Sequence, residues 1–168
     1  MSIIVEDGTG KSTAESYISV ADASSYFTAR GNTSWAAITT DALREGYLRL
    51  ATEYMLQVYR NRWQGARYTE TQVLDWPRTG VVRDSWEVAI DEIPVEVKRA
   101  CAELALRASA GTLNPDLSQG VISEKVGPIA VTYDHYSPQS PRYKAIEAML
   151  APYLLSTGNG VSVKLERS

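Results

Sequence analysis

The chain has 168 residues, 44% of them apolar, and a formal net charge of -3 at pH 7 with a pI near 5.2. This length allows one domain with a real core, and the slightly acidic balance excludes a globally basic surface that would capture nucleic acid or anionic membranes. The single cysteine, Cys101, excludes an internal disulfide framework and suits a reducing cytosol. Since no apolar run reaches the roughly 18 residues of a membrane helix, we expect no membrane partner.

The N-terminal third predicts a short strand and two helices. Residues 2–5 favour a strand, and the glycines of residues 7–10 favour a turn. Ser19, with Asp22 three residues later, predicts a helix start, and Gly31 predicts its end. Thr40 is expected to cap the second helix. That helix carries an apolar stripe at three- and four-residue steps, which we expect to be buried: Leu43, Tyr47, Leu50, Ala51, Tyr54, Met55 and Val58.

The middle of the chain is irregular and rich in tryptophan. Residues 69–75 predict a short helix that must stop before Pro77, inside a loop between residues 61 and 93. We expect this loop to be ordered, because it holds Trp63, Trp76 and Trp86. Pro94 is suited to the first position of the next helix, and Gly111 to its end. The predicted buried stripe of that helix is Val97, Ala100, Cys101, Leu104, Ala105 and Ala108.

The C-terminal third predicts a hairpin, a helix and an arm. Residues 121–126 and 129–133 are β-prone and flank Gly127-Pro128, and a helix over 142–155 should be shortened by Pro152. Residues 161–165 alternate apolar and polar side chains after glycines, which favours a strand added to another subunit's sheet edge. The predicted fold is therefore mainly α, a small helical bundle over residues 1–157 with a hairpin near 121–133 and an extended C-terminal β arm at 158–168.

No catalytic motif is complete. The turn from Gly8 to Thr13 invites a phosphate-loop interpretation, but that motif needs a glycine where Val5 stands, so Lys11 is expected to be a solvated loop residue. His135 is the only histidine and has no partner at metal-ligand or triad spacing. We therefore predict a protein that is not an enzyme and that has no catalytic residue, cofactor or metal.

Residues 59–83 interleave aromatic and basic side chains, and two interpretations remain open. Stacking aromatic rings on a basic groove is how single-stranded nucleic acid is held, which makes this segment a candidate binding surface. Alternatively, the tryptophans are core anchors whose neighbouring arginines bind carbonyl groups and acids of adjacent elements. The residues concerned are Tyr59, Arg60, Arg62, Trp63, Arg67, Tyr68, Trp76, Arg78 and Arg83, against Glu70 and Asp75.

Several motifs together resemble one family. They are Ile4-Val5-Glu6-Asp7-Gly8-Thr9-Gly10, Ser16-Tyr17-Ile18-Ser19-Val20, Trp63-Gln64-Gly65, Leu74-Asp75-Trp76-Pro77-Arg78-Thr79-Gly80, Ser123-Glu124-Lys125-Val126-Gly127-Pro128 and Gly158-Asn159-Gly160. In order and spacing, over nearly the whole chain, these resemble the head-to-tail adaptors of tailed bacteriophages, some of whose members are labelled DnaT-like single-stranded DNA binding.

The resemblance implies a structural virion protein. Its expected form is a homo-oligomeric ring of twelve copies between the portal protein and a tail or stopper protein, with double-stranded DNA passing through the lumen. The expected location is the virion neck, and the host cytoplasm during assembly. We predict structural anchors at Trp63, Trp76, Pro77 and Arg78. The predicted subunit or portal interface comprises Val121, Ser123, Val126, Ile129, Val131, Tyr133, Val161, Val163 and Leu165. The alternative is single-stranded nucleic-acid binding through residues 59–83.

Overall fold

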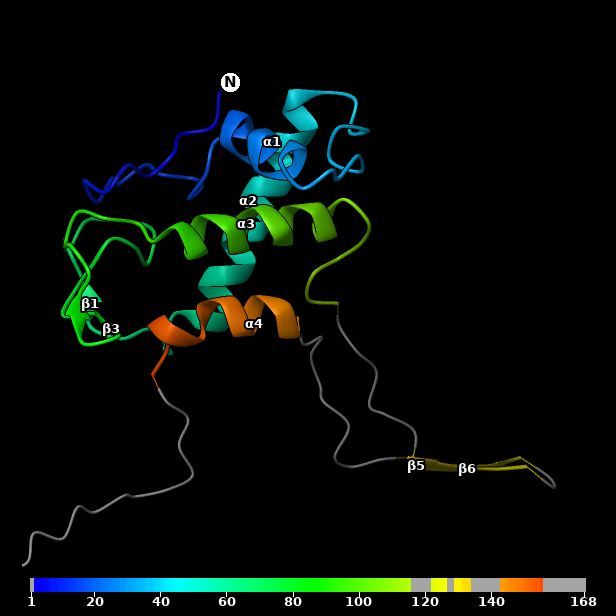
Figure 1. Ribbon diagram of the computed structural model, residues 1–168. Helices are drawn as coiled ribbons and strands as arrows, with labels where there is room; N and C mark the ends of the chain where they lie inside the picture. Colours follow the sequence, from blue (N-terminus) through cyan, green and yellow to red (C-terminus); the bar gives the residue numbers. More distant parts are fainter. Residues whose placement is uncertain (1, 116–121, 127–128, 134–142, 156–168) are drawn as a thin grey trace, which may run out of the picture.

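The computed structural model describes residues 2–115, 122–126, 129–133 and 143–155. In these residues the protein is mainly helical, as predicted, with three short two-stranded antiparallel ladders (Figure 1). The helices are α1 (Val20–Thr28), α2 (Asp41–Tyr59), α3 (Val95–Ala108), α4 (Lys144–Leu150) and the 3-10 turn η1 (Ala151–Tyr153). The strands are β1 (Ala66–Arg67), β2 (Arg78–Thr79), β3 (Val82–Arg83), β4 (Trp86–Glu87), β5 (Ile122–Val126) and β6 (Ile129–Tyr133). None of these helices combines the length and the apolar composition that crossing a membrane requires.

The N-terminal segment does not form the predicted strand. Val5 makes only a single parallel bridge with Ser16, and the Glu6 N–H donates to the Ser16 carbonyl group at 2.9 Å. The α1 cap is confirmed, since Ser19 Oγ accepts a hydrogen bond from Asp22 N–H at 3.0 Å and donates to Asp22 Oδ2 at 2.7 Å. Gly31 follows the end of α1 at a φ of 65°, a conformation in which glycine is favoured.

Helix α2 begins as predicted, and its buried face overlaps most of the predicted stripe. Thr40 Oγ1 accepts a hydrogen bond from Leu43 N–H at 3.3 Å and so caps the helix. The predicted stripe is wrong at Leu43 and Leu50, which are 47% and 50% exposed. Ala51, Tyr54 and Met55 of the predicted stripe are buried, and Tyr47 and Val58 are partly buried against the core. The residues that are buried are Leu48, Ala51, Thr52, Tyr54, Met55 and Tyr59.

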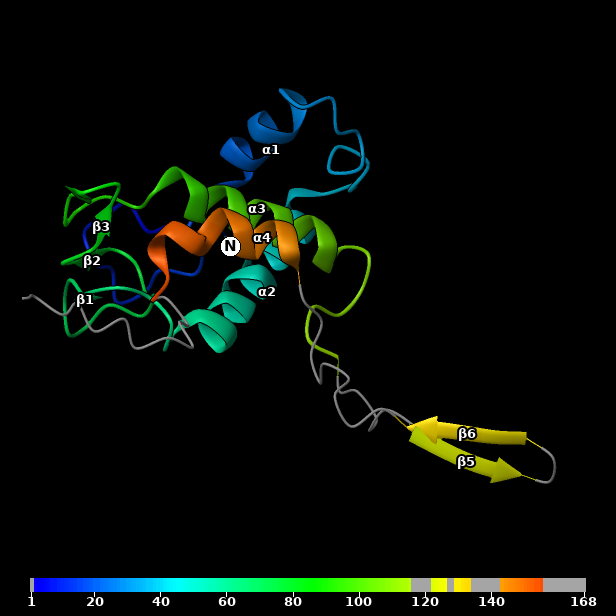
Figure 2. The same cartoon turned by 60° about the horizontal axis from the view of Figure 1, so that its bottom comes forward.

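Helix α3 forms the centre of the core. It begins at Val95, one residue later than predicted, and Pro94 precedes it as the N-cap. Its buried face is the predicted one except that Ala108 is only partly buried. Figures 1 and 2 show α2 crossing α3, with α4 packed along α3. The alanines of α3 permit this close approach of the helices.

The loop between α2 and α3 is ordered, but the helix predicted for residues 69–75 is absent. The side chain of Gln72 holds this segment in a non-helical conformation. Its Oε1 accepts a hydrogen bond from Thr69 N–H at 2.8 Å, and its Nε2 donates to the carbonyl groups of Leu74 at 2.9 Å and Pro77 at 3.0 Å. These side-chain bonds to the backbone compete with helix formation. The peptide bond between Trp76 and Pro77 is cis.

The C-terminal third contains the predicted hairpin and the predicted short helix. Strands β5 and β6 pair antiparallel, with Ser123 opposite Thr132 and Val126 opposite Ile129, and among the named elements they contact only each other. Helix α4 ends at Leu150 and gives way to η1, which contains Pro152, as expected for a proline in the last turn. The predicted C-terminal arm at 158–168 lies outside the described residues.

Candidate functional site

The glycine-rich turn at residues 8–11 is filled by a carboxylate of the chain itself. Glu6 is 1% exposed, and its Oε1 accepts hydrogen bonds from the N–H groups of Gly8 at 3.0 Å and Gly10 at 2.9 Å. Its Oε2 accepts from Lys11 N–H at 2.7 Å. Convergent backbone amides of this kind form anion sites, and here Glu6 occupies the site that a phosphate would need.

Lys11 lies in a loop and is partly exposed, as predicted, but its side chain is also bound within the turn. Its Nζ donates to the Val5 carbonyl at 3.0 Å and pairs with Asp7 at 2.7 Å, and only 35% of its side chain is exposed. The hydrogen bonds from Lys11 and Thr9 lower the pKa of the Asp7 carboxyl. The turn is thus a closed structural element.

The aromatic residues of the 59–83 segment point into the core. Tyr59, Trp63 and Trp76 are 1%, 2% and 0% exposed. The Trp63 ring packs on Tyr59 at 5.8 Å between centroids and edge-on against Trp76 at 5.7 Å, and Trp76 in turn packs edge-on against Tyr153 of η1 at 5.7 Å. Bases therefore cannot stack on these three rings, and Tyr68, which is 42% exposed, is the ring of the segment that remains available.

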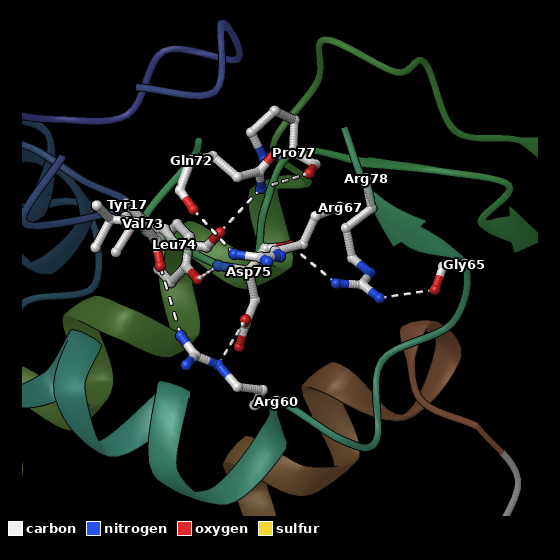
Figure 3. Close-up of polar contacts among 10 residues, drawn as sticks. All are labelled: Tyr17, Arg60, Gly65, Arg67, Gln72, Val73, Leu74, Asp75, Pro77 and Arg78. Atoms are coloured by element: carbon white, nitrogen blue, oxygen red, sulfur yellow. Dashed lines mark hydrogen bonds and ion pairs between the residues drawn. The ribbon is translucent and has the colours of Figure 1, made fainter. Parts of the chain in front are cut away.

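Arg78 binds the loop together from inside. Its guanidinium donates to the carbonyl groups of Gly65 at 2.7 Å and Asp75 at 3.0 Å (Figure 3). It also donates to the carbonyl group of Gln64 at 2.6 Å. The side chain is 6% exposed, and burial lowers its pKa below the usual value for arginine. Arg78 thus satisfies three backbone acceptors in a segment with little regular structure.

Two further arginines lie beside Arg78 and reach the surface. Arg60 Nε donates to Asp75 Oδ1 at 3.1 Å while half of its side chain is exposed, and Arg67 Nη1 donates to the Gln72 carbonyl at 3.0 Å. Arg60, Arg67, Asp75 and Arg78 line one hollow of about 310 Å³, here called the arginine cluster. With three guanidinium groups against one carboxylate, the cluster is a concave cationic site (Figure 3).

The other arginines of the segment are engaged elsewhere. Arg62 lies 3.8 Å from Glu147, and Arg83 pairs with Glu96 at 3.2 Å and donates to the Tyr153 hydroxyl. Burial, together with the hydrogen bond to Glu96, raises the pKa of Tyr153 to about 12. These contacts tie the loop to α3, α4 and η1.

The sequence reasoning missed one prominent surface residue, Trp86. It is 80% exposed at the start of β4, where the turn residues Asp84 and Ser85 both have positive φ. A lone tryptophan among charged residues next to a two-residue turn was the available signal. Asp84 and Glu87 beside it are also exposed, so this part of the loop is acidic.

The residues predicted for a subunit or portal interface fall into two groups. Ser123, Val126, Ile129, Val131 and Tyr133 lie on the paired strands β5 and β6. Val121, Val161, Val163 and Leu165 lie outside the described residues, as does His135.

These observations define a small, mainly helical protein with a concave arginine cluster beside a buried aromatic core. The chain belongs to the family described as "Putative DnaT-like ssDNA binding protein", whose model matches residues 1–168. No curated protein and no solved structure matches the chain. The family match gives no support to the adaptor role that the sequence resemblance implies, and that role remains a prediction.

Proposed function

We propose that the protein binds single-stranded nucleic acid through its phosphates at the arginine cluster. The family description supports this proposal, and the observation that carries it is the convergence of Arg60, Arg67 and Arg78 on one hollow. Arginine forms bidentate hydrogen bonds with phosphate, which suits a concave site of this kind.

The three arginines have different roles in this proposal. Arg78 is buried and bound to three carbonyl groups, so it contributes positive potential and holds the loop in place. Arg60 and Arg67 are exposed, and each has guanidinium N–H groups left to meet a phosphate. Two phosphate contacts correspond to a slope of about -1.4 for log K against log salt with a single strand, which means weak, salt-sensitive binding.

The proposed binding mode differs from the one that the sequence suggests. Tyr59, Trp63 and Trp76 are buried, so base stacking on them is excluded. Tyr68 directly follows Arg67 in the sequence and is 42% exposed, so it is the one aromatic ring of this segment that a base could reach. We therefore expect phosphate contacts with at most one stacked base, and little sequence preference.

The test is a titration of a labelled single strand at several salt concentrations, followed by fluorescence anisotropy. Replacement of Arg67 by alanine should weaken binding and reduce the salt slope by about 0.7. Arg30→Ala is the matched control, because Arg30 is exposed just after the end of α1, packs on Tyr26 and does not line the arginine cluster. Binding by Arg67→Ala with the affinity and salt slope of the unmodified protein would overturn the proposal.

A second candidate is the connector role, in which the protein is a subunit of a ring of about twelve copies between a portal and a tail or stopper protein. The observation that favours it is the β5–β6 hairpin, whose strands contact no other named element and so are open to pairing with another chain. The overall charge of -3 also suits a conduit through which double-stranded DNA slides without being gripped. In this role the protein would reside in the virion neck, and in the host cytoplasm during assembly.

The connector role is tested by measuring the mass of the purified protein alone and after mixing with a portal ring. A ring-sized species, or co-migration with the portal, is the expected result. A chain truncated from Gly158 onward should fold but fail to join particles, whereas its normal incorporation would remove the arm from the proposal. A protein that stays monomeric and does not bind the portal would contradict the connector role, and nucleic-acid binding would then be the remaining proposal. Neither candidate role includes catalysis.

A further inference from the structure

The surface around the β3–β4 turn exposes apolar side chains that the fold leaves uncovered. Trp86 is 80% exposed, and Val82, Ile90 and Val95, which are close to it in the sequence, are 49%, 44% and 46% exposed. A hollow of about 300 Å³ lies beside Trp86 and reaches Pro94, the N-cap of α3. An exposed tryptophan next to a hollow is typical of a surface that a partner covers, because buried aromatic rings contribute strongly to such contacts.

The turn between β3 and β4 fixes the position of Trp86. Asp84 and Ser85 have φ angles of 52° and 69°, as the two central residues of a tight hairpin turn require. Arg83 is opposite Trp86 in the ladder, but its guanidinium lies over the Tyr153 ring, 5.7 Å from the centroid. In the described part of the chain, no cation lies over the Trp86 ring. The face of this ring is therefore open to a cation from another molecule.

Carboxylates surround the same hollow. Asp84, Glu87 and Glu92 line it, against one guanidinium, that of Arg83. Arg83 is already neutralised within the chain, since it pairs with Glu96 at 3.2 Å. Asp84 lies 3.9 Å from Arg83, whereas Glu87 and Glu92 are exposed and form no ion pair with the other described residues. Two carboxylates are thus free to meet a ligand, and they attract cations and repel phosphates.

We propose that this hollow, here called the Trp86 hollow, binds an arginine-rich segment of a partner protein. A guanidinium stacks on the face of an indole ring, and its N–H groups can at the same time donate to the carboxylates of Glu87 and Glu92. Arginine suits the hollow better than lysine, because its planar guanidinium combines stacking with paired hydrogen bonds. The exposed apolar side chains nearby would cover the aliphatic stems of the bound arginines.

This inference rests on neither proposed function. The Trp86 hollow is lined by residues between 83 and 94 and by Tyr153, whereas residues between 60 and 78 line the arginine cluster. The two sites also have opposite charge, so they select different ligands. Loss of peptide binding and loss of nucleic-acid binding can therefore be measured separately.

The experiment is a titration of a labelled peptide of alternating arginine and glycine with the full chain, followed by fluorescence anisotropy. The same peptide with glutamate in place of arginine is the control for the probe, and it should bind at least about tenfold more weakly. Trp86→Ala should raise the Kd for the arginine peptide by about fivefold or more, because the cation–π contact is lost. Trp86 is exposed, so the variant should fold, which circular dichroism checks.

Glu87→Gln separates the charge of the hollow from the overall charge of the protein. It should raise the Kd for the arginine peptide by about threefold. Glu53→Gln is the matched control, because it removes the same charge from an exposed position on α2 and should leave the Kd within about 1.5-fold. Equal effects of these two substitutions, equal binding of the two peptides, or a Trp86→Ala variant that binds like the unmodified protein would each overturn the proposal.

Two further measurements on Trp86→Ala test for other occupants of the Trp86 hollow. Binding of a labelled single strand should be unchanged, and so should the mass of the protein in sedimentation. Weaker binding of the single strand would assign the hollow to nucleic acid. Loss of a self-association that the unmodified protein shows would assign it to a second copy of the chain. Either result would overturn the proposal.

Discussion

The α2–α3 helix pair and the loop over residues 61–93 are both ordered, yet different interactions stabilise them. The face of α3 that meets α2 is apolar, with Val97, Ala100, Cys101 and Leu104 all 0% exposed. The loop buries Trp76 and Leu74 as well, but it also buries the polar side chains of Gln72, Asp75 and Arg78.

The difference follows from where the backbone hydrogen bonds are made. Within a helix the N–H and C=O groups satisfy one another, so side chains are free to be apolar. The loop has only two-residue strands, and Gln72 and Arg78 supply the missing donors to its carbonyl groups. An irregular segment can thus be as well ordered as a helix if polar side chains form hydrogen bonds with its backbone groups.

The largest effect is expected from Trp76→Ala, which tests whether the loop belongs to the same cooperative core as the helices. Removing this fully buried ring should lower the free energy of unfolding by about 4 kcal/mol, comparable to Leu104→Ala in α3. Urea unfolding followed by circular dichroism and by fluorescence would measure both. Trp86→Ala is the control and should change stability by no more than about 0.5 kcal/mol. A loss below about 1 kcal/mol for Trp76→Ala would mean that the loop opens independently of the helices.

Arg78→Met tests the polar part of the comparison. It leaves the carbonyl groups of Gln64, Gly65 and Asp75 without these donors, and we expect a loss of about 3 kcal/mol. Arg67→Met removes one hydrogen bond of an exposed guanidinium and should cost about 0.5–1 kcal/mol. Equal effects of the two substitutions in urea unfolding would contradict the structural role assigned to Arg78.

Two glycines should respond to alanine with opposite signs. Gly65 has a φ of 65°, and a Cβ there would lie 2.1 Å from the Thr79 carbonyl oxygen, so Gly65→Ala should destabilise the loop by about 2 kcal/mol. Gly46→Ala in α2 has open space and should stabilise the monomer by about 1 kcal/mol. Thermal unfolding at low protein concentration would compare them, and two changes of the same sign would contradict the prediction.

The smallest effect concerns pH and the contact of the N-terminal segment with α2. Hydrogen bonds from Arg49 lower the pKa of the Glu15 carboxyl in the folded state. The contribution of Glu15 is therefore complete above its unfolded pKa of about 4.3, and it is lost as the pH falls through the lower folded value. Glu15→Gln should make stability less dependent on pH in this acidic range. If Glu15→Gln left the pH profile of the unfolding midpoint unchanged, the contact between Glu15 and Arg49 would make no contribution to stability.

The candidate site was only partly predictable from the sequence. The composition of residues 59–83 indicates a basic and aromatic segment, and the arginine cluster does come from it. The direction of each side chain was not predictable, because it depends on partners far away in the chain, such as Tyr153 packed against Trp76. Glu6, which closes the glycine turn that resembles a phosphate loop, is a different case, because its hydrogen-bond partners Gly8, Gly10 and Lys11 are close in the chain and local reasoning overlooked them.

The sequence by itself determined the local features of the structure. The caps at Ser19 and Thr40, the short α4 before Pro152 and the pairing of β5 with β6 all depend on residues close together in the chain, where spacing and backbone preference suffice. Tertiary structure decided which edge of the apolar face of α2 is buried, leaving Leu43 and Leu50 outside, and turned Trp63 and Trp76 inward. Those choices depend on how helices and loops meet across long stretches of chain, and hydrophobic periodicity does not carry that information.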